Sequence, residues 1–206
     1  MASERSREHS VNEWSELSPA KRQLLERRFL GQLAGNPRSA KVPRRTGSGP
    51  FPLSFGQQRL WFLDQIEPSS PLYSVGWAAE LRGPLNLDAL RLAFNTIVKR
   101  HESLRTTYSH FDGSPVQVIA EDRLVEWSLF NLETADPVSQ TSDVNVILKK
   151  EAQRPFDLSR DLMLRATLIR LGPEQAILLI VIHHIASDGW SMGVLLEELR
   201  AGYAAF

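Results

Sequence analysis

Cysteine is absent from this 206-residue chain. Without thiols the chain can form no disulfide framework, and a thiolate nucleophile or a thiolate metal site is excluded. This composition fits a cytoplasmic setting, where disulfides are rare. The chain also lacks a surplus of either charge, because 24 Lys and Arg balance 24 Asp and Glu. Nucleic-acid binding is disfavoured as a main function, since neutralising phosphates requires a basic surplus.

Long hydrophobic runs are absent as well. No apolar segment approaches the length that spans a bilayer, and the opening residues MASERSREHS do not form a signal peptide. We therefore expect no membrane association. What the chain does have is a hydrophobic fraction of 42%, which is enough for a core. Its length fits one domain of ordinary size with an appendage.

The first fifty residues form a separate unit by charge. They carry ten basic and five acidic residues, a balance of plus five, so the remainder carries minus five. Ser18-Pro19 is typical of a helix start, and an apolar stripe runs from there to Gly35. We predict a helical leader over residues 1–35. Residues 36–50 are basic and rich in Pro and Gly, which predicts a flexible linker, and residues 51–206 form the globular part.

Helical patterns follow in the globular part. The apolar spacing predicts a helix behind Ser54 and a second one over residues 90–101, capped by Asn86 or Asp88. A third helical pattern around Val144 ends before residue 155.

Strand patterns alternate with these helices. An extended segment covers residues 73–81, and residues 104–111 and 116–119 flank Asp112-Gly113-Ser114-Pro115, which is a hairpin signal. Residues 163–171 and 175–184 read as paired strands joined through Gly172-Pro173. This mixture predicts the α/β class, arranged as an α+β two-layer sandwich.

A cluster of polar residues stands at the end of the last strand. The run from Ala176 to Ile182 is short and rich in branched side chains, which predicts a strand buried on both faces. His183-His184-Ile185-Ala186-Ser187-Asp188-Gly189 follows it directly. An amphipathic helix comes next, with Asp188 or Ser191 as its cap. The polar residues therefore lie in a strand-loop-helix unit, where the strand ends.

The two adjacent histidines should face opposite sides if the strand continues through both. Only one could then face a given cleft, and the other would need a hydrogen-bond partner in the interior. The same geometry argues against a metal site, because neighbouring strand residues rarely converge on one ion. The alternative is that neither histidine has a catalytic role, and that both are hydrogen-bonded residues of the core that precede a capped helix.

Several segments together resemble the condensation domains of nonribosomal peptide synthetases. Residues 54–63 (SFGQQRLWFL) resemble the first motif of that family, and residues 100–106 (RHESLRT) resemble the second. Residues 183–189 match the HHxxxDG signature of the third motif. Residues 156–158 and 164–165 resemble a further family segment, although the usual proline before the Leu-Arg pair is replaced. The resemblance covers about residues 50–206, with the motifs in the family's order.

The resemblance implies a chloramphenicol-acetyltransferase-like fold of two lobes with a tunnel between them. Donor and acceptor carrier proteins would dock at opposite mouths of the tunnel, each presenting a thioester on a phosphopantetheine arm. The acceptor amine would attack the donor thioester and form an amide. The sequence reaches Phe206 before the later motifs of the family. We therefore expect an N-terminal lobe with its leader and without the C-terminal lobe, and we expect this lobe to be inactive by itself.

The resemblance also implies roles for individual residues. His184 would be the catalytic residue, as a base, as a positioning group or as a donor to the oxyanion. His183 would be structural, and Asp188 would form an ion pair that shapes the site. Arg105 is a candidate partner for that pair, unless an arginine of the second lobe takes the role or Arg105 is a solvated charge. Gly189 would let the thioester arm approach the backbone.

The implied partners are the two carrier proteins, the C-terminal lobe and a downstream adenylation domain. No cofactor would bind directly, since the substrates arrive on phosphopantetheine arms, and no metal is expected. The leader, residues 1–35, would dock an upstream synthase protein or would pack on its own domain. Two other functions compete with the condensation reaction. One is a stand-alone acyltransferase of the same superfamily, and the other is a non-catalytic platform that recruits another protein.

Overall fold

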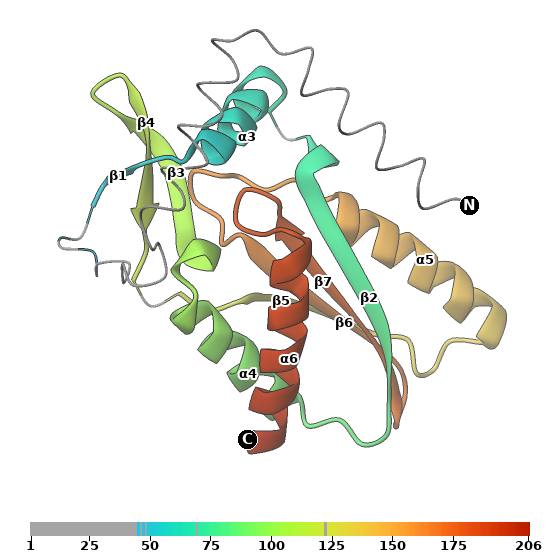
Figure 1. Cartoon of the computed structure of the whole chain (residues 1–206). Coiled ribbons are helices and arrows are strands. Elements are labelled where there is room, and N and C mark those ends of the chain that lie inside the picture. The colour runs from blue at the N-terminus through green and yellow to red at the C-terminus, as the bar shows by residue number, and fades with distance from the viewer. Residues whose placement is uncertain (1–44, 46, 48, 69, 122) are drawn as a thin grey trace, which may run out of the picture. The chain divides into compact units, whose positions relative to one another are not determined.

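The computed structural model describes residues 45, 47, 49–68, 70–121 and 123–206. The predicted leader helix and most of the predicted linker lie outside the described residues, so these expectations stay predictions. Within the described ranges, strands and helices are interspersed along the chain (Figure 1).

A four-stranded sheet carries the site. Its strand order is β2-β7-β6-β5, with β7 antiparallel to both of its neighbours and β5 parallel to β6. The strands span Ser74–Arg82 (β2), Glu126–Asn131 (β5), Leu164–Gly172 (β6) and Gln175–His183 (β7). β7 lies between two partners, so the backbone leading to the histidine pair is fixed from both sides.

The parallel pair explains one helix. Parallel strands cannot be joined by a tight turn, and here α5, Pro137–Gln153, makes the crossover from β5 to β6. Asp136 begins this helix, because its carboxylate accepts hydrogen bonds from the N–H groups of Val138 and Ser139. Leu148 and Ala152 of α5 pack with Leu179 of β7, so α5 covers one face of the sheet.

Two further helices, α4 (Leu87–Arg100) and α6 (Gly189–Ala205), cover the opposite face (Figure 1). Asn86 caps α4 by accepting from the N–H groups of Asp88 and Ala89. The two helices approach closely where Gly202 meets Ala93. A Cβ built on Gly202 would lie 3.0 Å from the Ala93 Cβ atom.

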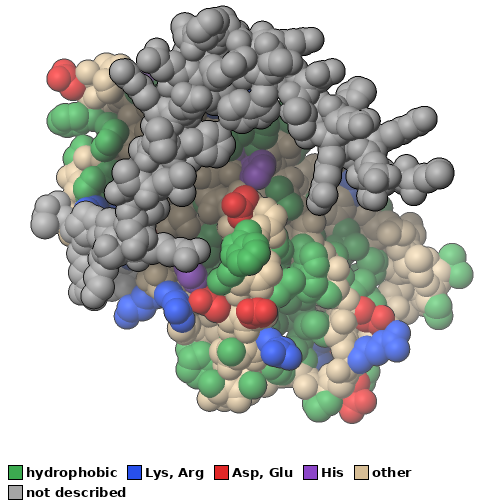
Figure 2. Space-filling model, viewed as in Figure 1, with side chains coloured by type: hydrophobic (Ala, Val, Ile, Leu, Met, Phe, Trp, Pro, Cys, Tyr) green, Lys and Arg blue, Asp and Glu red, His purple; other side chains and the backbone are tan. Residues whose placement is uncertain are grey.

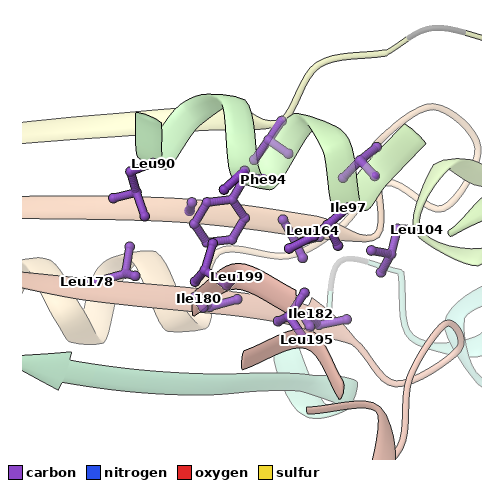
Figure 3. Packing of buried hydrophobic residues seen from close by; sticks show 14 of the residues in the cluster. Leu90, Phe94, Ile97, Leu104, Leu164, Leu178, Ile180, Ile182, Leu195 and Leu199 are labelled. Atoms are coloured by element: carbon purple, nitrogen blue, oxygen red, sulfur yellow. The ribbon is translucent and has the colours of Figure 1, made fainter. Parts of the chain in front are cut away.

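The core follows from the alternation along β7. Ile180 and Ile182 face α4 and α6, whereas Leu179 and Val181 face the side of α5. Figure 3 shows Phe94 of α4 directed toward Ile180 and Leu199, and Phe94 has no exposed surface. Each fully buried side chain of this kind stabilises the fold by about 1.5–3 kcal/mol. Both faces are covered, which is why the sequence of β7 is continuously apolar.

A second, three-stranded sheet has the order β1-β4-β3. Its strands are Phe51–Pro52 (β1), Thr106–Phe111 (β3) and Ser114–Ile119 (β4), and α3, Phe55–Ile66, follows β1. Ser54 and Gln57 form a capping box at the start of α3. Two short 3-10 helices, η1 (Pro71–Tyr73) and η2 (Glu102–Arg105), lead into β2 and β3. Backbone bonds from Tyr108 to Leu158 and from Met163 to Leu104 connect these parts to the chain around β6.

Within the described residues the expected elements are confirmed, with differences mainly at their ends; for example, β7 ends at His183 rather than at His184. Leu104 lies in η2 rather than in a strand, and the hairpin turn is shorter than expected because β4 already begins at Ser114. β5 was not expected, since only Trp127 and Leu129 alternate in a six-residue segment. The α/β class is confirmed. Helices lie on both faces of the four-stranded sheet, because the β5–β6 crossover adds a layer beyond the two that were expected.

Candidate functional site

The end of β7 fixes the backbone of both histidines. The His183 N–H donates to the carbonyl oxygen of Met163 at 3.1 Å, and the His184 N–H donates to that of Tyr73 at 2.8 Å. The strand ends at His183, and the chain then turns through residues 185–188 into α6. The two rings are therefore placed in different surroundings.

His183 is buried, with 4% of its surface exposed. Its Nδ1 accepts the N–H of Ile185 at 3.1 Å, so in the neutral ring the proton lies on Nε2. The ring meets those of Tyr73 and Phe156 edge to face, at centroid distances of 6.5 and 5.7 Å. Burial lowers the pKa of His183 to about 4, helped by the positive charges of His184 and Arg165. His183 is therefore neutral near pH 7, and its contacts fit the structural role expected for it.

His184 is exposed. Its Nδ1 lies 2.5 Å from the carbonyl oxygen of Ser187, and a carbonyl only accepts, so Nδ1 must be the donor. Nε2 of the neutral ring then carries the free lone pair, and no hydrogen bond to it is made within the described residues. The two histidines thus have opposite tautomers. The free nitrogen of His184 is a base that can accept a proton from an approaching group.

Asp188 caps α6. Its carboxylate accepts from the Ser191 N–H at 2.9 Å and from the Ser191 hydroxyl at 2.7 Å, and these bonds lower the pKa of Asp188. Ser191 completes a capping box by accepting the Asp188 N–H. Gly189 follows as the first residue of the helix, and the space around its Cα is open.

Arg105 does not meet Asp188. Its guanidinium donates to the carbonyl oxygen of Ala120 and lies 3.7 Å from the Glu102 carboxylate. In the described part of the chain, Asp188 forms no ion pair. Ser191 binds one oxygen of the Asp188 carboxylate, and the ion pair expected for Asp188 stays a prediction, with an arginine of a second lobe as the other candidate partner.

The sequence did not single out three residues that lie behind the motif. Tyr73 binds the backbone of His184, and Phe156 contacts the ring of His183. Arg165 of β6 is buried, with its guanidinium carbon 3.8 Å from the centroid of the Phe156 ring. Phe156 and Arg165 belong to segments that resembled the family, but no spacing rule brings residues so far apart in the chain together.

Residues 184–188, between β7 and α6, form the motif loop. A hollow of about 150 Å³ lies beside this loop, between η2 and the start of α6. Leu104, Ile182, Trp190 and Leu195 are among its lining residues. Figure 2 shows hydrophobic side chains along the face of α6 that lies toward the viewer, with charged side chains among them. In the described residues no group of three or more His, Asp or Glu side chains could hold a metal ion, and no helix is long and apolar enough to cross a membrane.

Comparison with known proteins agrees with this geometry. The family model described as Condensation domain matches residues 48–206, so the chain belongs to the condensation-domain family. A linear gramicidin synthase protein of Brevibacillus parabrevis is 40% identical over 186 residues, which cover 89% of this chain and 4% of the relative. The bassianolide nonribosomal cyclodepsipeptide synthetase of Beauveria bassiana is 44% identical over 164 residues, 80% of this chain and 5% of the relative.

Solved structures show the same fold. The starter condensation domain of rhizomide synthetase RzmA has a TM-score of 0.68 at 19% identity, over 75% of this chain and 37% of that chain. The first condensation domain of the calcium-dependent antibiotic synthetase has a TM-score of 0.65 at 22% identity, over 74% and 36%. The chain thus has the chloramphenicol-acetyltransferase-like fold of a condensation-domain lobe. It spans a small part of the curated relatives and about a third of the solved chains.

Proposed function

We propose that this chain supplies the histidine-bearing lobe of a domain that joins a carrier-bound acyl or peptidyl thioester to a carrier-bound aminoacyl group. The observation that carries the proposal is the His184 ring. It is exposed, Ser187 orients it through Nδ1, and Nε2 is left with its lone pair. The family membership supplies the reaction type, and natural-product synthetases are the relatives.

The tautomer disfavours one of the three roles that the sequence left open. The acceptor amine attacks the thioester carbonyl carbon, and Nε2 of His184 accepts the amine proton as the new C–N bond forms. The C–S bond then breaks, and the same proton passes from Nε2 to the departing thiolate. A neutral Nε2 has no proton to donate to an oxyanion at the outset, which disfavours that role. Of the two remaining roles, we assign that of the base to His184, because it accounts for the proton that the amine loses.

The test is His184→Gln in the complete domain, assayed with donor and acceptor carrier proteins loaded with thioesters. Removing a general base should lower turnover by roughly 10²- to 10⁴-fold while the thermal midpoint stays unchanged. His110→Gln is the matched control, since His110 is exposed and lies against Trp61 of α3. Equal turnover in His184→Gln and the parent would remove His184 from the mechanism.

The same assay, extended to a soluble acyl thioester, distinguishes the proposed function from two other functions. A stand-alone acyltransferase would use a soluble acyl thioester as readily as a carrier-bound donor. A recruitment platform without catalysis would give the same result with His184 or Gln at this position. The exposed, oriented ring of His184 favours a catalytic role over the platform.

The carrier proteins, the C-terminal lobe and a downstream adenylation domain are proposed partners. The chain covers 37% of the rhizomide condensation structure, so we propose that the tunnel needs the residues of a second lobe. The 206-residue chain by itself should give no amide product with loaded carriers. Product formation by this chain alone would contradict the two-lobe requirement. A cytoplasmic location stays a prediction.

For the leader, residues 1–35, we propose docking to the C-terminal end of an upstream synthase protein. The support is its sequence, an apolar stripe with basic residues around it. A double variant, Leu25→Glu with Phe29→Glu, should abolish binding of that upstream segment to the full chain and leave the thermal midpoint unchanged. The alternative is that the leader packs on its own domain. It would be favoured if the parent chain did not bind the upstream segment and the double variant had a lower thermal midpoint.

A further inference from the structure

Arg165 is a buried cation without a carboxylate partner among the described residues. Only 3% of its surface is exposed. Its guanidinium donates to the carbonyl oxygen of Pro155 at 2.9 Å and to that of Arg154, while its Nε makes no hydrogen bond. Burial lowers the pKa of Arg165 to about 10. Burying an arginine in this way is costly, and a leucine would fill the same core at lower cost.

Its contacts lead from the core toward the motif. The guanidinium carbon stands 3.8 Å above the centroid of the Phe156 ring, and the two bound carbonyls belong to the residues just before Phe156. Arg165 therefore holds both the backbone that precedes Phe156 and the face of its ring.

The next contact is with the histidine pair. The Phe156 ring meets the His183 ring edge to face, at 5.7 Å and an interplanar angle of 74°. His183, the last residue of β7, in turn accepts the N–H of Ile185 in the motif loop. The same loop returns the Ser187 carbonyl to Nδ1 of His184. An unbroken series of contacts thus joins Arg165 to the His184 ring.

We propose that Arg165 is a positioning residue for His184, acting through Phe156, His183 and the motif loop. The proposal rests on the proposed function for its meaning in catalysis. According to this proposal, the buried guanidinium stabilises the position of the His184 ring from the sheet face opposite α4 and α6. Small displacements of a catalytic group are costly, so a residue that fixes the His184 ring would affect turnover without touching a substrate.

The test reads the tautomer of His184 in the full 206-residue chain. With ¹⁵N-labelled protein, long-range ¹H–¹⁵N spectra should show the parent with the His184 proton on Nδ1 and the His183 proton on Nε2. His184→Gln assigns the signals by removing one set. In Arg165→Met, His184 should lose this preference and move toward the Nε2–H form that predominates in free histidine. An unchanged Nδ1–H form in Arg165→Met would overturn the proposal.

The matched control is Arg170→Met. Arg170 lies on the same strand, pairs with Glu133 at 2.8 Å and is exposed at the end away from the motif. Its spectra should equal those of the parent. If Arg165→Met does not fold, Phe156→Leu takes its place, because leucine keeps apolar volume but removes the ring between the guanidinium and His183. An unchanged His184 tautomer in Phe156→Leu would equally overturn the proposal.

A second readout separates this proposal from the proposed function. In the complete domain, Arg165→Met should lower kcat by roughly 10²-fold and leave KM unchanged, since Arg165 does not touch a substrate. A tautomer change without loss of turnover would leave the positioning intact and contradict the catalytic role of His184. A loss of turnover without a tautomer change would overturn the positioning.

Discussion

The two adjacent histidines differ because the strand ends between them. His183 still belongs to β7 and turns into the apolar layer beside Tyr73 and Phe156, whereas His184 begins the loop. Identical side chains thus receive opposite tautomers from their partners, a backbone N–H in one case and a carbonyl in the other. The division into a buried and an exposed histidine follows from one step of chain geometry.

The buried histidine predicts how stability depends on pH. The pKa of His183 is about 4 in the folded chain and near 6.5 when unfolded. Between these values the unfolded state binds more protons, so stability is full above pH 6.5 and falls as the pH drops toward 4. At ~1.4 kcal/mol per pKa unit, the loss is roughly 3 kcal/mol. Urea unfolding at pH 7 and pH 4.5 measures it.

The matched variants isolate this histidine. His183→Gln should be less stable than the parent at pH 7 but should lose less stability on acidification, while His110→Gln should follow the parent. Asp64 contributes with the opposite sign, because burial raises its pKa. The comparison is therefore between variants at each pH. An acid loss of equal size in His183→Gln and the parent would show that His183 does not titrate as described.

Asp188 can be tested as a cap and as a charge separately. Asparagine caps helices as well as aspartate does but carries no charge. If Asp188 serves only the cap of α6, Asp188→Asn should keep both the thermal midpoint and turnover. Asp188→Ala should lower the midpoint by a few degrees. A large loss of turnover in Asp188→Asn with an unchanged midpoint would instead favour an ion pair with an arginine of the second lobe.

At the scale of elements, α6 connects the site to the core. The helix begins at the site, with Gly189, and ends where Gly202 touches Ala93 of α4. Glu198 between these ends lies 2.6 Å from Nε2 of His101 and 3.4 Å from the Arg100 guanidinium, so the C-terminal end of α4 also binds α6. The contacts between the helices therefore set the direction in which α6 leaves the motif loop.

The close approach of the two helices gives a stability prediction. Gly202→Ala places a methyl group 3.0 Å from the Ala93 Cβ atom and 3.4 Å from its Cα atom, which is tighter than most Cβ contacts in proteins. We expect a loss of about 1–3 kcal/mol in the free energy of unfolding. Gly193→Ala on the same helix has open space and should stabilise by about 0.5–1 kcal/mol. Equal effects of the two substitutions in urea unfolding would contradict the close crossing.

The sequence predicted most elements because their signals are local. Ser54, Asn86 and the apolar run of β7 each act within a few residues of themselves, and the structure places them as expected. β5 was missed because its position depends on pairing with β6, more than thirty residues later. The position of Arg165 behind Phe156 and His183 depends in the same way on how three distant segments pack.

At the scale of the whole domain, the four-stranded sheet separates two apolar clusters that share its strands. Phe94 belongs to the cluster on the side of α4 and α6, and Trp61 to the cluster on the side of α5. β7 contributes Ile180 to the first cluster and Leu179 to the second. A substitution that destabilises one cluster should therefore destabilise both, and the described residues should unfold in one transition.

Phe94→Ala tests this coupling. Phe94 has no exposed surface and meets Trp127 edge to face at 5.3 Å, so the substitution leaves a cavity between α4, α6 and the sheet. The free energy of unfolding should fall by about 3–5 kcal/mol. Phe55→Ala is the control, since Phe55 is 91% exposed and should change stability by less than about 0.5 kcal/mol. Tryptophan fluorescence and far-ultraviolet circular dichroism should report the same lowered midpoint, and midpoints that separate would show that the two clusters unfold independently.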